Sequence, residues 1–351
     1  MKKIIIKIAI TILLFLIIIL IFNLKKLRKK KIGVIGVRHC NNIGANLLKY
    51  AISIKLSEFG FIPYIIGNHY QNKDISFLKK RTNCIIIKNN YSEITKNFFD
   101  ILMVNSDQTW RKFDKYFYDY GFLNFAKNWN TPKFVYGASL GYNNWKLTRE
   151  DERVIKYLLK NFTGISVREI GSIKMIERHL GIKPVFVLDP TLLIDKKYYL
   201  DLLNLYKGRK PINNFIFTYV LKREKNIDIF IKNSSKLLNY EIYNDKKSEK
   251  NSIEKFIYGI INCKAVITDS YHGTIFSIIF NKPFVTFIFS NSPKERFISL
   301  KEIFKIEDRI FEYFQMPNIS LLTTPLNINH TFINLLKNKS INYLKKNLGI
   351  I

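Results

Sequence analysis

His272 has the clearest potential for chemistry in this chain of 351 residues. It lies in the stretch Thr268–Thr274, which reads TDSYHGT and follows an apolar run that predicts a β-strand. An imidazole can exchange protons near neutral pH, and the N-terminus of the helix expected next attracts anions. A lone His is most often structural. One flanked by Asp, Ser, Tyr and Gly at a strand end is a candidate for acid/base catalysis or phosphate binding.

Polar residues also follow a second predicted strand, Ile101–Val104. Ser106, Asp107, Gln108 and Trp110 come directly after it. They could cap a helix and bury the Trp, because Ser and Asp are both good capping residues. They could equally form a hydrogen-bonding floor for a polyhydroxyl substrate, with Trp110 as its apolar wall.

Two more stretches carry groups that bind anions. Arg168 follows a predicted strand beside Glu169, either as half of a local ion pair or as a fork for a carboxylate or phosphate. The turn Asn42–Ala45, which contains Gly44, opens a predicted helix and could present its backbone N–H groups to an anion. It lacks the GxGxxG pattern, so a dinucleotide site is not predicted.

The elements that must position these residues alternate between strands and helices, which is typical of an α/β fold. The first unit is a strand at Lys31–Val37, a helix from Gly44 that ends at Gly60, and a strand at Tyr64–Ile66. Several later strands are continuous apolar runs, as expected for parallel strands covered on both faces. Strands are predicted at 84–87, 101–104, 134–136, 164–167, 185–188, 214–220, 265–268 and 283–289, and helices at 227–238, 253–261 and 274–280.

This pattern divides the chain into two Rossmann-like domains. The first covers residues 32–194, a linker covers 195–212, and the second domain covers 213–351 and ends in a helical tail. Two such halves place a ligand crevice between them, at the carboxyl ends of the strands. We therefore expect the polar stretches to meet there.

The N-terminal residues predict one transmembrane helix. From Ile4 to Phe22 the chain is almost entirely apolar, which is long enough to cross about 30 Å of hydrocarbon. No small-residue cleavage site follows, so an uncleaved anchor over residues 1–24 is favoured over a signal peptide. The basic juxtamembrane segment 25–31 predicts a single-pass protein whose globular part lies in the cytoplasm.

The composition narrows the choice of partners. There are 57 Lys and Arg residues against 27 Asp and Glu, a net charge of +30. The excess is spread through sequence rich in Lys, Ile and Asn, which favours anionic small substrates or an anionic membrane surface over nucleic acid. Cys40, Cys84 and Cys263 form no CxxC pair, so neither a zinc site nor a disulfide framework is indicated. No metal ion or cofactor is predicted.

Taken in order, these motifs resemble those of the polysaccharide pyruvyl transferase family. The family pattern runs N-x-G-A, G-S-D-Q-x-W, S-V-R-E, D-P-T and T-D-S-F-H-G-T. The matching stretches are Asn42–Ala45, Ser106–Trp110, Ser166–Glu169, Asp189–Thr191 and Thr268–Thr274. Each motif alone is weak, whereas five in register over about residues 32–290 are specific.

Several features depart from the family pattern. Asn105 stands where the family has the glycine of G-S-D-Q, a change that would strain any turn that needs a positive φ. Leu48 replaces a Gln found in many members, and Tyr271 replaces Phe. The anchor is not expected of the family's usual soluble members.

The resemblance implies a fold similar to GT-B glycosyltransferases. It also implies transfer of a pyruvyl group from phosphoenolpyruvate to two hydroxyls of a sugar, with formation of a cyclic ketal. The donor carries a phosphate and a carboxylate, so its site needs cations and oriented N–H groups. We expect His272 to bind phosphate and act as acid or base, Arg168 to clamp the donor, and Asp107 to orient an acceptor hydroxyl. Further donor ligands are expected at Ser270, Tyr271, Gly273 and Thr274, and acceptor or donor ligands at Asn42, Gly44, Ala45, Ser106, Gln108 and Trp110.

The expected acceptor is a cell-surface polysaccharide or a lipid-linked glycan precursor, beside which the anchor would hold the enzyme. Two alternatives stay open. A nucleotide-sugar glycosyltransferase would share the two-domain layout and release a nucleoside diphosphate. A non-catalytic glycan-binding or assembly protein at the membrane is the other, and Asn105 and Leu48 favour it.

Overall fold

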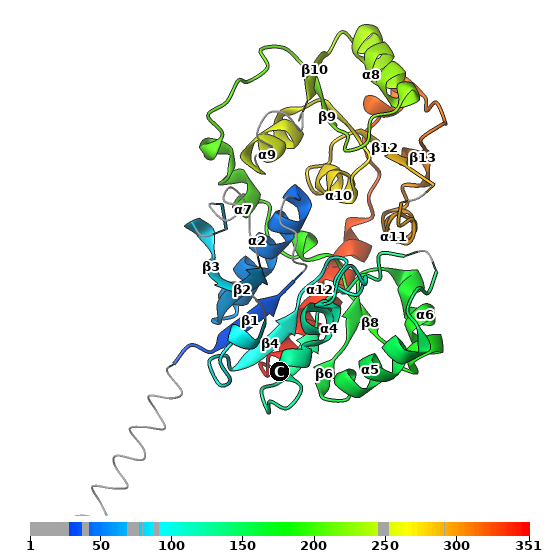
Figure 1. Cartoon of the computed structure of the whole chain (residues 1–351). Coiled ribbons are helices and arrows are strands. Elements are labelled where there is room, and N and C mark those ends of the chain that lie inside the picture. Colours follow the sequence, from blue (N-terminus) through cyan, green and yellow to red (C-terminus); the bar gives the residue numbers. More distant parts are fainter. Residues whose placement is uncertain are drawn as a thin grey trace, which may run out of the picture.

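The computed structural model describes residues 28–36, 42–68, 77–78, 80–87, 91–142, 144–244, 253–290 and 292–351. The predicted anchor, residues 1–24, lies outside the described residues, as do residues 25–27 of the basic segment. Within the described ranges, no helix combines the length and the apolar character that crossing a membrane requires. Figure 1 shows two α/β halves, one above the other.

The first half is built on a parallel sheet of six strands in the order β3-β2-β1-β4-β5-β6. The strands are β1 (Lys31–Ile35), β2 (Ile62–Asn68), β3 (Asn83–Ile87), β4 (Ile101–Val104), β5 (Lys133–Val135) and β6 (Phe162–Gly164). Ile35 at the end of β1 is in register with Ile66 of β2 and Val104 of β4. The chain therefore leaves β1 and β4 at the same level of the sheet.

Helices cover both faces of this sheet, which explains why its central strands β1 and β4 are almost entirely apolar. In β4, Ile101 and Met103 pack in the same cluster as α2, whereas Leu102 and Val104 pack with α4, α5 and α6. These helices are α2 (Ile43–Glu58), α4 (Phe117–Phe122), α5 (Arg149–Leu159) and α6 (Ile170–Leu180).

The second half contains a parallel sheet of five strands in the order β10-β9-β11-β12-β13. Its strands are β9 (Phe215–Tyr219), β10 (Glu241–Asn244), β11 (Ala265–Thr268), β12 (Phe284–Ile288) and β13 (Ile310–Glu312). Its helices are α8 (Lys225–Leu238), α9 (Ile253–Asn262), α10 (Tyr271–Ile279) and α11 (Glu295–Phe304). α10 begins before the predicted start at Thr274, because Ser270 caps it with an Oγ that accepts from the Gly273 N–H. His272 thus lies in the first turn of the helix.

Short elements join the two halves. The predicted linker contains α7 (Lys197–Leu200) and a 3-10 helix, η4 (Leu203–Leu205). The strands predicted at 164–167 and 185–188 give β7 (Ser166–Val167) and β8 (Val185–Phe186), which pair with each other as a separate parallel ribbon. The remaining 3-10 helices are η1 (Tyr91–Glu93), η2 (Asn124–Ala126), η3 (Pro190–Leu192), η5 (Glu307–Arg309) and η6 (Ile319–Leu322).

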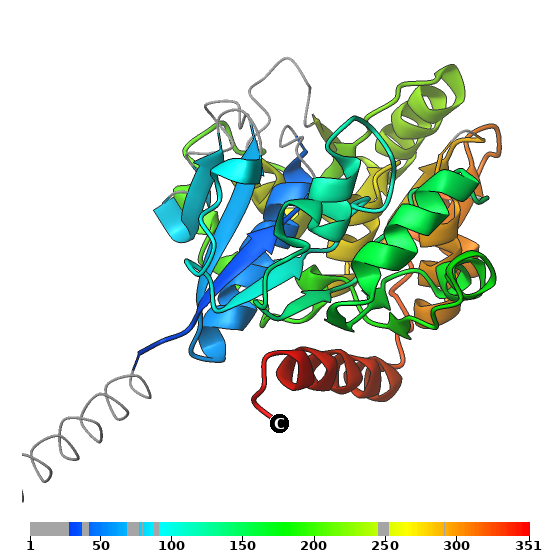
Figure 2. The ribbon, with the colours of Figure 1, turned by 60° about the horizontal axis from the view of Figure 1, so that its bottom comes forward.

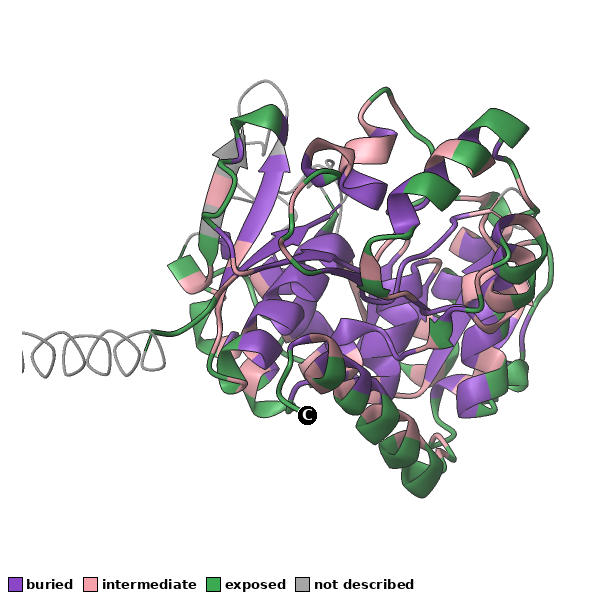
Figure 3. Ribbon diagram, turned by 90° about the horizontal axis from the view of Figure 1, so that it is seen from below, coloured by how far each residue is buried: buried purple, intermediate pink, exposed green. Residues whose placement is uncertain are grey.

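The last helix, α12 (His330–Asn347), returns to the first half. The Leu188 N–H donates to Ser340 Oγ at 2.9 Å, and the Tyr343 hydroxyl donates to the Val135 carbonyl at 2.7 Å. Figure 2 shows the helix in red along the lower side of the molecule, and Figure 3 shows it from below, with much of its surface exposed. The helical tail predicted for the second domain therefore packs on the first.

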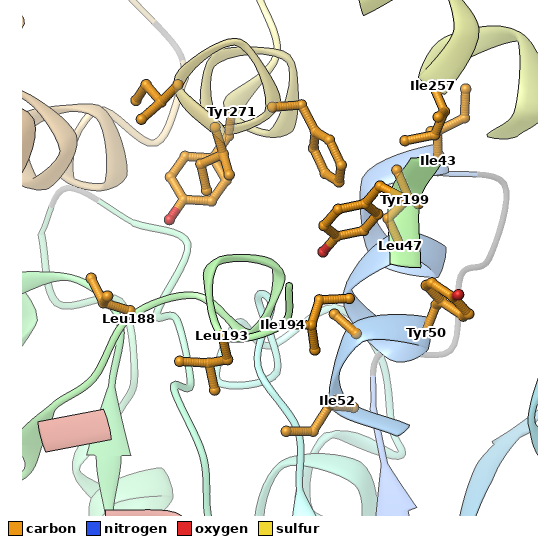
Figure 4. Packing of buried hydrophobic residues seen from close by; sticks show 14 of the residues in the cluster. Ile43, Leu47, Tyr50, Ile52, Leu188, Leu193, Ile194, Tyr199, Ile257 and Tyr271 are labelled. Carbon is orange, nitrogen blue, oxygen red and sulfur yellow. The ribbon is translucent and has the colours of Figure 1, made fainter. Parts of the chain in front are cut away.

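One apolar cluster runs through both halves and holds them together (Figure 4). Leu47 and Tyr50 of α2, Tyr199 of α7, Ile257 of α9 and Tyr271 of α10 all belong to it. Because these side chains form one continuous core, the start of α2 is held against the start of α10.

Candidate active site at the junction of the two halves

The N-termini of α2 and α10 meet where the carboxyl ends of the two sheets face each other. Gly44 in the first turn of α2 lies so close to His272 that a Cβ at residue 44 would fall 2.0 Å from the imidazole Nδ1. Asn42 caps α2 through an Oδ1 that accepts from the Ala45 N–H at 3.3 Å. Two helix N-termini at one place give a positive potential that favours an anion.

A cavity of about 270 Å³ opens beside this contact. Its lining residues come from both halves and are Asn42, Ala45, Asp107, Gln108, Phe113, Leu221, Ser270, Tyr271, His272 and Arg296. The sequence had indicated all of these as site residues except Phe113, Leu221 and Arg296. Within the described residues, no group of three or more His, Cys, Asp or Glu side chains is placed to hold a metal ion.

His272 is a buried imidazole with an unpaired nitrogen. Its Nε2 has no hydrogen-bond partner and lies 3.8 Å from Asp189 Oδ2. Burial lowers the pKa of His272 from 6.5 to about 4, and the opposing attraction of Asp189 does not offset it. The side chain is therefore neutral at pH 7, which makes it a proton acceptor rather than a cation.

Arg168 is the centre of a buried ion-pair cluster. Its Nη1 donates to Asp189 Oδ2 at 2.7 Å, its Nη2 donates to Asp107 Oδ1 at 3.1 Å, and its Nε lies 3.6 Å from Glu169 Oε1. Burial opposes the charge, but the surrounding groups raise the pKa of Arg168 overall. Of the three carboxylate partners, only Asp107 lines the cavity. Three carboxylates thus offset the positive charge of Arg168 before any ligand is bound.

Arg296 supplies a second guanidinium. Its Cζ lies 5.6 Å from the centre of the Tyr271 ring, and the Cζ of Arg168 lies 4.7 Å from the same ring. The Nε of Arg296 has no hydrogen-bond partner. Burial and the nearby charge of Arg168 lower the pKa of Arg296. A guanidinium in this position gains from any anion that enters the cavity.

Ser106 and Trp110 do not line the cavity. Ser106 Oγ donates to the Gly137 carbonyl at 2.7 Å, and the Trp110 indole N–H donates to the Gly121 carbonyl at 3.0 Å. Trp110 is only 1% exposed. Both side chains hold the framework beneath the site.

Gly273 and Thr274 also hold the framework and do not line the cavity. A Cβ at Gly273 would fall 2.3 Å from Thr268 Oγ1, so glycine is needed for α10 to approach the end of β11. The hydroxyls of Thr274 and Thr286 share a hydrogen bond of 2.8 Å. These contacts orient α10 and, with it, His272.

Phe113 forms the apolar wall of the cavity that one of the two interpretations of the sequence assigned to Trp110, whereas Trp110 itself is buried, as the other interpretation expected. Phe113 is 43% exposed and lines the cavity. Arg111 stacks 4.8 Å from the ring centre and also donates to Gln108 Oε1 at 3.0 Å. The aromatic wall and the amide of Gln108 therefore lie on one side of the cavity.

The sequence profile of polysaccharide pyruvyl transferases matches residues 42–291, a range that contains every lining residue except Arg296. The chain belongs to the polysaccharide pyruvyl transferase family. Among curated proteins, none matches the chain.

The family member also shares its fold with solved structures of low sequence identity. A putative UDP-N-acetylglucosamine 2-epimerase from Listeria monocytogenes superposes with a TM-score of 0.51 and 11% identity, over 91% of each chain. S. aureus MnaA with UDP superposes with a TM-score of 0.51 and 13% identity, over 92% of this chain and 98% of the other. Arabidopsis thaliana UGT89C1 complexed with UDP-L-rhamnose superposes with a TM-score of 0.55 and 7% identity, over 90% of this chain and 98% of the other. These similarities show a GT-B-like fold.

In this pyruvyl transferase family member, Asn105 does not carry a positive φ. The left-handed residue of the turn is Asp107, with φ of 90°, and its carbonyl accepts from the Ser139 N–H at 2.9 Å. Asn105 is 1% exposed, and neither its amide oxygen nor its amide nitrogen has a hydrogen-bond partner. The substitution leaves a buried amide unpaired instead of straining the backbone. Leu48, the other departure, is buried in α2 and does not line the cavity.

Proposed function

We propose that this protein transfers a pyruvyl group from phosphoenolpyruvate to two hydroxyls of a glycan, forming a cyclic ketal and releasing phosphate. The observation that carries the proposal is the grouping of neutral His272, Arg296 and two helix N-termini around one cavity. A donor with a phosphate and a carboxylate requires such a set of groups. Membership of the polysaccharide pyruvyl transferase family supports the same reaction.

The donor anions bind first to Arg296 and to the N-terminus of α10. Arg168 provides a second cation when the substrate carboxylate takes the place of Asp107, because Asp107 is the partner of Arg168 that reaches the cavity. Asp107 is then free to accept a hydrogen bond from an acceptor hydroxyl.

Neutral His272 acts as the base. It takes the proton of one acceptor hydroxyl as the hydroxyl oxygen adds to C2 of phosphoenolpyruvate, and it passes that proton to the methylene carbon, which becomes the methyl group. The second hydroxyl then forms its bond to C2 as the C–O bond to phosphate breaks, and its proton leaves with the phosphate. A bound phosphate stabilises the imidazolium, so donor binding raises the pKa of His272 toward the working pH.

Phe113 and Gln108 receive the acceptor. The exposed ring of Phe113 offers an apolar surface to the face of a sugar, and the amide of Gln108 offers hydrogen bonds to its hydroxyls. The acceptor is a cell-surface polysaccharide or a lipid-linked glycan precursor.

Residues 1–24 anchor the enzyme in the membrane, with its globular part in the cytoplasm, where the donor is made. The apolar stretch and the basic segment after it support this arrangement. Protease added to intact cells should leave the globular part uncut. Cleavage of this part from outside would contradict the arrangement.

The reaction is tested with the full chain in detergent, phosphoenolpyruvate and a panel of nitrophenyl glycosides and lipid-linked sugars. We expect phosphate release that requires both donor and acceptor, with a mass gain of the product that corresponds to a pyruvyl ketal. His272→Gln should abolish it, whereas His179→Gln, on α6 away from the cavity, should not. Release of nucleoside diphosphate from a nucleotide sugar would favour the glycosyltransferase alternative.

A further inference from the structure

Helix α12 is attached to the protein by one side of its surface. Of its 18 residues, Ser340, Tyr343 and Leu344 are buried, and Ile333 and Leu336 are partly buried against the same apolar cluster. Ser340 and Tyr343 make the hydrogen bonds to Leu188 and Val135. Lys345 lies 5.9 Å from the centre of the Phe59 ring.

The outer side of α12 carries its own regular stripe. Exposed residues recur at steps of three and four along the helix, which places them on one face (Figure 3). Phe332 is 41% exposed and Leu335 is 50% exposed. Lys339 and Lys346 follow in the same stripe and are exposed. The face thus combines large apolar side chains with cations.

The C-terminal sequence itself carries charge of one sign. From residue 313 to residue 351 the chain contains no Asp or Glu, but it contains Lys337, Lys339, Lys345 and Lys346. In a chain with 27 acidic residues, a stretch of this length without any is a local property of the C-terminus.

The basic segment lies at the same end of the molecule. The Ile62 N–H donates to the Lys30 carbonyl at 2.9 Å, and Phe59, next to Lys345, comes shortly before Ile62. The exposed residues Arg28, Lys29 and Lys30 and the second half of α12 thus flank the same loop. Arg28 is paired with Asp100, so the cations that Lys29 and Lys30 contribute add to those of α12.

We propose that the outer face of α12 lies on the surface of an anionic lipid bilayer. An amphipathic helix binds there by burying apolar side chains at the headgroup level, while Lys residues attract the anionic lipids. Phe332 and Leu335 supply the apolar part, and Lys339 and Lys346 supply the charge. The contact is separate from catalysis, because α12 packs beside the C-terminal end of α2 and the cavity lies at its N-terminal end.

The test uses the full chain in nanodiscs of phosphatidylcholine alone or of phosphatidylcholine with phosphatidylglycerol. Leu335→Cys is introduced together with Cys40→Ser and Cys84→Ser, while Cys263 is buried and is kept. The rate of labelling by a charged maleimide should be several-fold lower in the anionic discs. Leu237→Cys on α8, 71% exposed, is the matched control and should be labelled equally fast in both.

The charge requirement is tested by adding Lys339→Glu and Lys346→Glu, which should restore fast labelling in anionic discs. Lys232→Glu and Lys236→Glu, exposed on α8, should leave the protection unchanged. Equal labelling of Leu335→Cys in both kinds of disc, or protection that survives the α12 charge reversal, would overturn the proposal. The assay needs no activity, so its outcome is independent of the proposed reaction.

Discussion

Gly44 and His272 approach each other more closely than any other residue type at position 44 would allow, since a Cβ there would fall 2.0 Å from Nδ1 of the imidazole. The approach joins the first turn of α2 to the first turn of α10, and hence one half of the molecule to the other. The imidazole of His272 can occupy its position in the cavity only because Gly44 has no Cβ.

Gly44→Ala should therefore displace His272 and lower kcat at least tenfold. Relief of the overlap should cost about 1–3 kcal/mol of unfolding free energy. Gly36→Ala is the control, because the nearest atom to its new Cβ, Lys49 Cε, would lie 3.6 Å away. Steady-state kinetics and urea unfolding of the two variants measure both effects, and equal kcat values would show that the contact does not position His272.

The lowered pKa of His272 makes stability depend on pH. The unfolded chain binds a proton near pH 6.5, whereas the folded chain does so only near pH 4, so stability is lost as the pH falls between these values. The loss attributable to His272 approaches about 3 kcal/mol. In His272→Gln, the fall in unfolding free energy from pH 7 to pH 4 should be smaller by up to this amount. Parallel pH curves for the two proteins would mean that the imidazole is not buried in the neutral form.

Arg296 should contribute to donor binding. We expect Arg296→Met to weaken binding of phosphoenolpyruvate by about 10- to 100-fold, the usual worth of hydrogen bonds to a charged group. Arg296→Lys keeps the charge but loses the two-pronged hydrogen bonding of the guanidinium. Its affinity for phosphoenolpyruvate should lie between those of the wild type and Arg296→Met. Titration calorimetry with phosphoenolpyruvate measures this. Arg178→Met, exposed on α6, serves as control, and an unchanged affinity in Arg296→Met would remove Arg296 from the site.

Arg168 should matter for folding as well as for donor binding. Arg168→Met would leave Asp189 and Glu169 buried without their cation and should cost about 3–5 kcal/mol of unfolding free energy. Arg153→Met removes an exposed ion pair with Glu150 and should cost less than about 1 kcal/mol. Urea unfolding distinguishes the two, and similar small losses would show that the cluster carries no net stabilisation.

Most strands could be predicted from sequence because they are largely apolar runs, and parallel strands covered on both faces favour this pattern. β6, β10 and β13 were missed, since they lie at the edges of the two sheets and are only partly apolar. The return of α12 to the first half depends on contacts with Val135 and Leu188, which lie far away in the chain. Hydrophobic periodicity is local and carries no information about such contacts.

In the candidate site, too, local motifs could be recognised in the sequence, whereas features that depend on the tertiary structure could not. Motifs placed Asp107, Ser270 and His272 correctly at strand ends, and the structure brings them to one cavity. Arg296 lies on α11, outside every motif, so no local signal marked it. Trp110 and Phe113 are close in the chain, but their burial depends on how the backbone turns at Asp107, where φ is positive.

The length of α2 sets the distance between the cavity and the contact with α12. Its 16 residues span about 24 Å, with the cavity at one end and the contact with α12 at the other. If α12 lies on a bilayer as proposed, the reacting atoms stand at most about this far above the lipid headgroups. The proposed contact then favours acceptors with several sugar units between the lipid and the modified residue, because their tips reach the cavity most easily.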